Sequence, residues 1–306
     1  MDIKKNILST ILFYNLLEYP LSIFEIFKYL SISQDKYRNP RLADIFNNTK
    51  NELIKKENGL HYILQNRQII KQRIKREKIT AQKWKKVKKI CRILTIAPFI
   101  RGIGISGSLT LSNAKKESDF DLIIITETKR IWTTRFLLSI FLNFLNQKRT
   151  DAKTENKICL NCFLTIKSLE IKEEIKPHNL YSAQEYARII PIFENRKNLW
   201  QKFKTTNIWI KNYILNYPWP QPLKLPVSNN KIADFIRFTG EKMLDNFIGN
   251  SIETLLKNQQ MKRIKKNLTN NPDDQIFFSD EYLFFHPHSK SLKLLSRFHE
   301  ALNNID

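Results

Sequence analysis

The pattern of apolar and polar positions changes along the chain and divides it into parts. Residues 3–18 repeat apolar side chains every three or four positions, which predicts a helix. The same spacing predicts two shorter helices, over 23–30 and 41–56. An Asn-Gly pair followed by an aromatic segment at 60–64 predicts a hairpin. Residues 1–65 are therefore expected to form three short helices and a small hairpin.

The next segment is the most basic part of the chain. Residues 67–90 carry eleven Lys or Arg and one Glu, within a 306-residue chain of net charge +23. Their apolar residues lie three or four apart, which predicts a connecting helix over 66–98 with one apolar and one basic face. Such a face can follow a phosphate backbone, and it can equally be a solvated face.

The N-terminal elements resemble a winged helix-turn-helix module. Together with the basic helix, this resemblance makes nucleic acid a candidate partner of residues 1–98. Modules of this kind also serve as scaffolds that only pack against the next domain. Both interpretations of the N-terminal part stay open at this point.

Beyond Pro98 short apolar segments separated by turns and a helix indicate a mixed α/β pattern. Strands are predicted over 99–106, 120–126 and 157–166, with a helix over 131–146 between the last two. Residues 99–176 are therefore expected to form a core with a small mixed sheet.

Residues 177–306 are predicted to be mostly helical. The predicted helices cover 181–190, 199–215, 231–246, 251–267 and 289–303, with a proline-rich linker at 217–226 and a short strand pair within 275–286. The whole chain is expected to be α/β in the α+β sense: a small mixed-sheet core between the N-terminal module and this helical region.

Composition narrows the class of protein. Hydrophobic residues make up 42% of the chain and aromatic residues 11%, which excludes a disordered protein. No run of about 18 uncharged apolar residues occurs, so no membrane span and no membrane partner are expected. Three cysteines, an odd number in a large chain, indicate a reducing cytoplasm rather than a disulfide framework.

One stretch carries candidate chemistry. A strand runs into Gly107-Ser108, and Asp119 and Asp121 follow ten residues later at the start of the next strand. Glycine allows a sharp turn and a close approach to a ligand, and the amides after it favour a phosphate. The two aspartates lie two apart on a strand, so both side chains leave from one face. Adjacent carboxylates need a cation, and hard oxygen ligands select Mg²⁺ or Mn²⁺.

This pattern resembles the signature of the polymerase-beta-like nucleotidyltransferase superfamily, over residues 99–166. The resemblance implies an α/β fold, a divalent metal (Mg²⁺ or Mn²⁺), an NTP substrate, and transfer of NMP to an acceptor hydroxyl. It further implies that Gly107 and Ser108 bind the nucleotide and that Asp119 and Asp121 are catalytic metal ligands.

Active members of that superfamily usually carry a third carboxylate on a later strand. Here the corresponding strand holds Cys159 and Asn161, and the nearest carboxylates, Asp151 and Glu155, lie in the loop before it. The alternative is therefore a catalytically degenerate protein that senses nucleotide or binds nucleic acid through its winged helix. Cys159 and Cys162 have zinc-like spacing, but no second pair lies nearby, so both are expected to pack in the core.

Three cations follow the second strand: Lys129, Arg130 and Arg135. They are candidate phosphate contacts, and they can equally be solvated residues of the next helix. The acceptor stays open among RNA 3′ ends, small-molecule hydroxyls and proteins, because all three suit the same metal chemistry.

Overall fold

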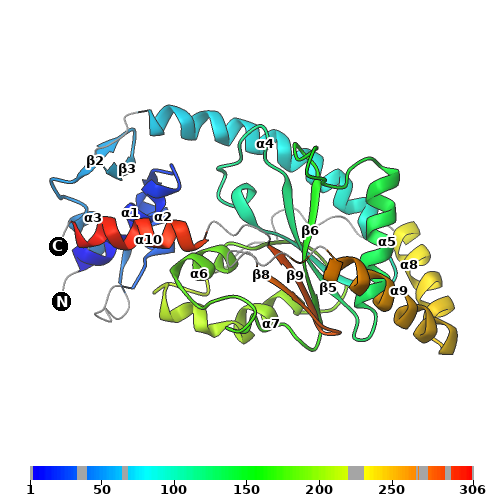
Figure 1. Ribbon diagram of the computed structural model, residues 1–306. Coiled ribbons are helices and arrows are strands. Elements are labelled where there is room, and N and C mark those ends of the chain that lie inside the picture. The colour runs from blue at the N-terminus through cyan, green and yellow to red at the C-terminus, as the bar shows by residue number, and fades with distance from the viewer. Residues whose placement is uncertain are drawn as a thin grey trace.

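The structure is a computed structural model that describes residues 3–32, 40–63, 68–219, 231–266, 268, 275–286 and 291–304. Within these residues the chain forms ten α-helices and two sheets, one of three strands and one of six (Figure 1). The expected mixed α/β class is confirmed. No described helix combines the length and the apolar character needed to cross a lipid bilayer.

The N-terminal part has three helices around a small antiparallel sheet with the strand order β1-β3-β2. Its elements are α1 (Ile3–Leu16), β1 (Leu21–Ser22), α2 (Ile23–Tyr29), α3 (Leu42–Asn48), β2 (Ile54–Glu57) and β3 (Leu60–Ile63). Ser22 caps α2 with its side chain, and Glu25 closes the capping box, because its carboxylate accepts from the Ser22 amide. The first two predicted helices and the hairpin are present.

The third predicted helix, 41–56, is wrong in its second half. Helix α3 ends at Asn48, and residues 54–57 form β2. The cause is the turn that follows, where Asn58 (φ 51°) and Gly59 (φ 75°) are both left-handed. A hairpin turn with two left-handed residues joins two paired strands, so the residues before it pair with β3 instead of extending the helix.

Helix α4 (Ile69–Leu94) is the predicted connecting helix, but its faces are not divided as predicted. Val87 and Leu94 are fully buried, whereas Ile74 is 46% exposed. Cations fill part of the inward face instead. The buried cations of α4 are Arg73, Arg76 and Lys83.

Two of these cations join α4 to the N-terminal part. Nη1 of Arg73 lies 2.8 Å from a carboxylate oxygen of Glu25. Nη2 of Arg76 lies 2.5 Å from a carboxylate oxygen of Glu18, and its Nη1 donates to Asn113 over 2.9 Å. Part of the basic character of α4 therefore serves internal ion pairs rather than a ligand.

The central sheet has the strand order β7-β4-β5-β6-β9-β8. Its strands are β4 (Ile100–Ile105), β5 (Phe120–Thr126), β6 (Ile158–Thr165), β7 (Ile190–Glu194), β8 (Gln275–Phe278) and β9 (Tyr282–His286). Only β5 and β6 are parallel, and they lie in the middle. Strands β7, β8 and β9 come from the region predicted to be mostly helical, and they complete the sheet on both sides.

Helices cover both faces of this sheet (Figure 1). One face packs against α4, α5 (Ile131–Phe144) and α9 (Phe247–Lys266), and the other against α6 (Leu180–Ala187) and α7 (Leu199–Thr206). Side chains along β5 point alternately to the two faces of the sheet. Phe120 and Leu122 belong to the core on the first face, and Ile123 and Ile125 to the core on the second.

The remaining helices differ from the predictions at their ends. The helix predicted over 199–215 is α7 followed by a 3₁₀ turn at Ile208–Asn212. Helix α8 spans Lys231–Leu244, and α10 (Ser291–Asn303) packs on α1, where the rings of Phe298 and Phe13 are 5.8 Å apart. Residues 220–226 of the predicted linker, residue 267 and residues 289–290 lie outside the described residues.

Candidate metal and nucleotide site

The turn after β4 brings the backbone against a carboxylate of β5. Gly107 has a left-handed φ of 70° and begins a short 3₁₀ turn, Gly107–Leu109. The amide of Ser106 donates to the carbonyl oxygen of Asp121 over 3.0 Å. A Cβ atom at residue 107 would overlap Oδ2 of Asp121, so only glycine fits both the backbone angle and the space. Gly107 therefore lies directly against Asp121.

The two aspartates share one face of β5, as their spacing predicts. Asp119 directly precedes the strand and Asp121 lies in it, and the intervening Phe120 is fully buried in the opposite core. Their face is the one that packs against α6 and α7. The carboxylates therefore lie at the start of β5, on the side of the sheet that faces α6.

The thiol of Cys159 lies beside the two carboxylates. Cys159 pairs with Asp121 in the parallel β5–β6 ladder. One ligand atom from each of Asp119, Asp121 and Cys159 can be chosen so that all three lie within 4.8 Å of one another. The expectation that Cys159 packs in the core is therefore wrong, because the ladder register places it beside the carboxylates. Cys162 is buried as expected, beyond an irregularity in that register.

A buried amide lies against the same group. Asn161 is 7% exposed, and its Nδ2 donates to Oδ1 of Asp121 over 3.2 Å. Its Oδ1 is buried and makes no hydrogen bond within the described residues. Buried polar atoms are normally satisfied, so an unpaired amide oxygen at this place is itself an observation in favour of a ligand.

Arg149, from the loop between α5 and β6, closes the group. Its amide donates to the carbonyl oxygen of Ile158 over 3.0 Å, which fixes the backbone beside the start of β6. Its Nη1 lies 3.0 Å from Oδ2 of Asp119 and 3.3 Å from Sγ of Cys159. One guanidinium nitrogen thus touches two members of the three-residue group, while the side chain is 41% exposed.

Arg149 could not be predicted from the sequence, because one arginine in a polar loop has no distinguishing pattern. The carboxylates that the same loop offers do not join the group. Neither Asp151 nor Glu155 belongs to the Asp119–Asp121–Cys159 set found among the described residues, and Asp151 is exposed.

The carboxylates are crowded enough to change their proton affinity. Burial, with the charges of Asp119 and Glu185, raises the pKa of Asp121 to about 7, although Arg149 and Asn161 oppose the rise. Burial and the neighbouring Asp121 also raise the pKa of the Cys159 thiol to about 12. A bound cation would favour the ionised form of each of these groups.

Glu185, on α6, acts on the site through its charge, although it does not belong to the Asp119–Asp121–Cys159 group. It is half-buried, forms an ion pair with Lys176 over 3.4 Å, and its charge contributes to the raised pKa of Asp121. Sequence analysis identified no third carboxylate on the later strand, and Glu185 comes from a helix on the facing layer. Only the packing of α6 on the sheet reveals it.

Lys83 of the basic helix supports the loop that leads into Asp119. Its Nζ donates to the carbonyl oxygens of Lys116 and Ser118 over 2.9 and 2.7 Å, and to Oδ1 of Asn156 over 2.9 Å. The ammonium therefore fixes the loop before Asp119 to the loop before β6. Lys83 is buried and positions the site without touching its carboxylates.

Other predicted contacts do not reach the group. The Ser108 side chain is half-buried and makes no hydrogen bond with the described residues. Arg130 and Arg135 follow the opposite end of β5, are largely buried and contact α9, Arg130 at Asn250 and Arg135 at Gln260. The interpretation of these two arginines as phosphate contacts is therefore wrong.

A scan against models of known protein families found no match, and searches of curated proteins and of solved structures also found none.

The donor set fits a divalent cation. Asp119 and Asp121 offer carboxylate oxygens, the unpaired Oδ1 of Asn161 is a further hard donor, and Cys159 adds sulfur. Carboxylate and amide oxygens suit Mg²⁺ and Mn²⁺, and a sulfur ligand favours the softer Mn²⁺ of the two. The two carboxylates therefore fit the predicted metal, whereas the Cys159 sulfur is a softer donor than Mg²⁺ prefers.

Proposed function

We propose that this protein is a metal-dependent nucleotidyltransferase that transfers NMP from an NTP to an acceptor hydroxyl. The observation that carries the proposal is the meeting of the Gly107 turn with Asp119 and Asp121. A glycine that lets the backbone approach closely lies directly against Asp121, and Asp119 leaves the same face of that chain segment two residues earlier. A phosphate beside such a pair is the arrangement that transfer of a nucleotidyl group requires.

Each residue has a distinct role in this proposal. Asp119 and Asp121 would hold Mg²⁺ or Mn²⁺, which supplies charge stabilisation for the triphosphate and the leaving pyrophosphate when bound. Gly107 lets the turn lie against Asp121, so that the backbone amides after it can bind the phosphates, and Ser108 offers them a hydroxyl donor. Arg149 is partly exposed and can leave Asp119 for a phosphate oxygen, a stronger bidentate partner.

A second candidate function is a catalytically degenerate sensor or regulator of the same fold. The observation that favours it is Cys159, which pairs in register with Asp121 on the strand where active members of the resembled superfamily carry a carboxylate. The partner in that case is nucleic acid, bound through residues 1–98. The exposed lysines of α4 fit such a partner: Lys71, Lys75, Lys78, Lys85, Lys86 and Lys89.

A label-transfer assay separates the two functions. The protein is incubated with each α-³²P-labelled NTP and Mg²⁺ or Mn²⁺, with total RNA, small-molecule hydroxyl compounds or lysate protein as acceptors. We expect metal-dependent transfer that Asp119→Asn and Asp121→Asn abolish. Asp151→Asn, an exposed aspartate outside the group, is the matched control and should retain activity. The labelled species identifies the acceptor.

Full transfer by both site variants would exclude this site. NTP binding without transfer under any condition would favour the sensor. In that case duplex binding should weaken by orders of magnitude between low and moderate salt.

A further inference from the structure

Helix α8 is turned the opposite way from an ordinary amphipathic helix of a folded protein. Its only buried residues are Ala233 and Arg237. Its large apolar side chains point away from the molecule, with Phe235 69% exposed and Met243 70% exposed. A surface helix normally buries its apolar stripe and exposes its charged one. Because its apolar residues face outward, α8 must be held to the rest of the protein by other contacts. The exposed apolar residues in turn indicate a binding partner.

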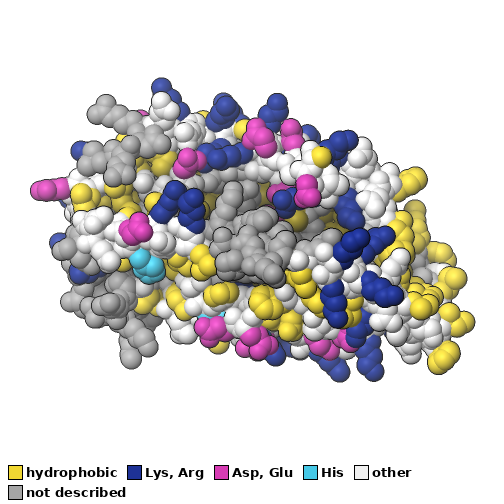
Figure 2. Space-filling model, viewed as in Figure 1, with side chains coloured by type: hydrophobic (Ala, Val, Ile, Leu, Met, Phe, Trp, Pro, Cys, Tyr) yellow, Lys and Arg dark blue, Asp and Glu magenta, His cyan; other side chains and the backbone are white. Residues whose placement is uncertain are grey.

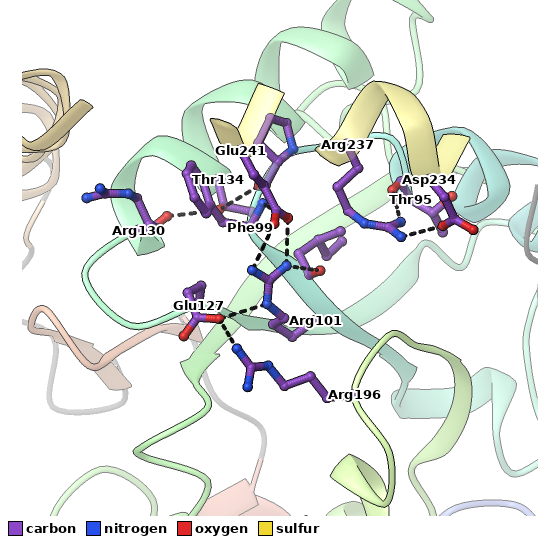
Figure 3. Close-up of polar contacts among 12 residues, drawn as sticks. Thr95, Phe99, Arg101, Glu127, Arg130, Thr134, Arg196, Asp234, Arg237 and Glu241 are labelled. Atoms are coloured by element: carbon purple, nitrogen blue, oxygen red, sulfur yellow. Dashed lines mark hydrogen bonds and ion pairs between the residues drawn. The ribbon is translucent and has the colours of Figure 1, made fainter. Parts of the chain in front are cut away.

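The inward attachment is a network of charged and polar groups (Figure 3). Both carboxylate oxygens of Glu241 accept from Arg101 of β4, over 2.7 and 3.1 Å, and one of them also accepts from the amide of Phe99 over 2.9 Å. Arg237 donates to the carbonyl oxygen of Thr95 over 2.8 Å and pairs with Asp234. These contacts hold α8 on the end of α4 and the sheet without using its apolar residues.

The apolar residues of α8 continue onto the first half of α9. We name this surface the outer face of α8–α9; it consists of Ile232, Phe235, Ile236, Phe238, Met243, Phe247, Ile248 and Leu255. Their exposed fractions run from 47% at Ile236 to 83% at Phe247. Figure 2 shows apolar side chains gathered at the end of the molecule where Figure 1 places these helices.

The outer face is large enough for a stable protein interface. At ~200 Å² for each aromatic side chain and somewhat less for each aliphatic one, its residues expose about 900 Å². The largest apolar patch on a typical monomer is ~300–600 Å². A standard interface takes ~800 Å² from each partner, so the outer face reaches the size of a complete interface.

The chemistry of the outer face favours protein over lipid. Phenylalanine and methionine, which are enriched in protein interfaces, supply half of its members.

We infer that the outer face of α8–α9 binds a second copy of this chain. Two helices joined by a two-residue turn present one apolar surface, and pairing with a copy across a twofold axis matches apolar to apolar without any other partner. The pairing of two such helix pairs has the form of a four-helix bundle. This inference does not depend on the proposed function.

The test is sedimentation velocity of the full chain between about 1 and 100 µM. We expect a dimer that becomes tighter as salt rises, because salt screens the repulsion between two basic chains. The variant Phe235→Ser/Phe247→Ser should raise the dissociation constant at least about a hundredfold. Phe144→Ser, which alters an 89% exposed phenylalanine of α5, should leave the dimer unchanged.

Met243→Lys is a second, independent variant, and circular dichroism melting reports whether each variant folds. A monomer at every concentration and salt would overturn the inference, and so would a dimer that neither outer-face variant weakens. Flotation of the monomer with phosphatidylcholine or phosphatidylserine vesicles, lost in Phe235→Ser/Phe247→Ser, would replace the second copy with a lipid surface.

Discussion

Replacing Arg149 tests whether the guanidinium competes with a metal for the same carboxylates. Nη1 of Arg149 lies 3.0 Å from Asp119, and the two side chains are 41% and 21% exposed. A pair of unit charges at ~4 Å contributes about 4 kcal/mol at an effective dielectric constant near 20 and about 1 kcal/mol in water. Because the guanidinium is so exposed, ~1–2 kcal/mol is the appropriate net value.

A metal that binds Asp119 must displace this guanidinium, so removing it should return the same free energy to metal binding. Arg149→Gln should therefore bind Mn²⁺ about 5- to 30-fold more tightly than the native chain. The assay is a Mn²⁺ titration followed by the electron paramagnetic resonance signal of the free ion. Lys153→Gln, an exposed cation of the same loop, is the control and should change the affinity little.

The opposite effect is expected for the nucleotide. If Arg149 moves to the triphosphate when metal and NTP bind together, Arg149→Gln should weaken NTP binding while it tightens Mn²⁺ binding. Unchanged or weaker Mn²⁺ binding by Arg149→Gln would refute competition and show that Arg149 supports the site instead.

Three further changes have expected outcomes. Gly107→Ala should lower stability and weaken Mn²⁺ binding beyond the ~1–2 kcal/mol of a left-handed alanine, because its Cβ overlaps Asp121; Gly59→Ala, left-handed but in open space, is the control in thermal melts. In a urea titration, Arg101→Met should lower the free energy of unfolding by about 3 kcal/mol, because it leaves the half-buried Glu127 and Glu241 without their shared partner. The exposed Arg196→Met should lower it by less than about 1 kcal/mol. The hydrogen bond from Arg76 lowers the pKa of Glu18, so this pair stabilises the fold above the ordinary glutamate pKa and is lost as pH falls below it; the pH profile of the melting temperature should be flatter for Glu18→Gln.

Local signals predicted the local parts of the fold. Alternation in β5 gave the two faces of the central strand, and the glycine turn with two aspartates gave the position of the candidate site. The elements that were not predicted depend on contacts between residues that are far apart in the sequence. Strand β7 contains Pro191, which argues against a central strand, yet β7 is an edge strand, where proline is tolerated. Its partner β4 lies about 85 residues earlier, and no local pattern encodes that pairing.

The site shows the same limit. Asp119, Asp121 and Gly107 share one local motif and could be found from it. Arg149 reaches the site from a loop, and Glu185 acts on Asp121 by its charge from a helix of another layer, so neither spacing nor composition reveals them. The inward face of α8 is a similar case, because its charges are buried only by virtue of partners such as Arg101 on a distant strand.

The most direct test of the proposed site is anomalous diffraction from crystals grown with Mn²⁺ and a non-hydrolysable NTP. We expect an anomalous peak bounded by Asp119, Asp121 and Cys159, with the triphosphate beside Gly107 and the Arg149 guanidinium moved from Asp119 to a phosphate oxygen. If the NTP analogue is bound but no anomalous peak lies at these residues, and Arg149 still contacts Asp119, the metal site and the transferase proposed from it are contradicted.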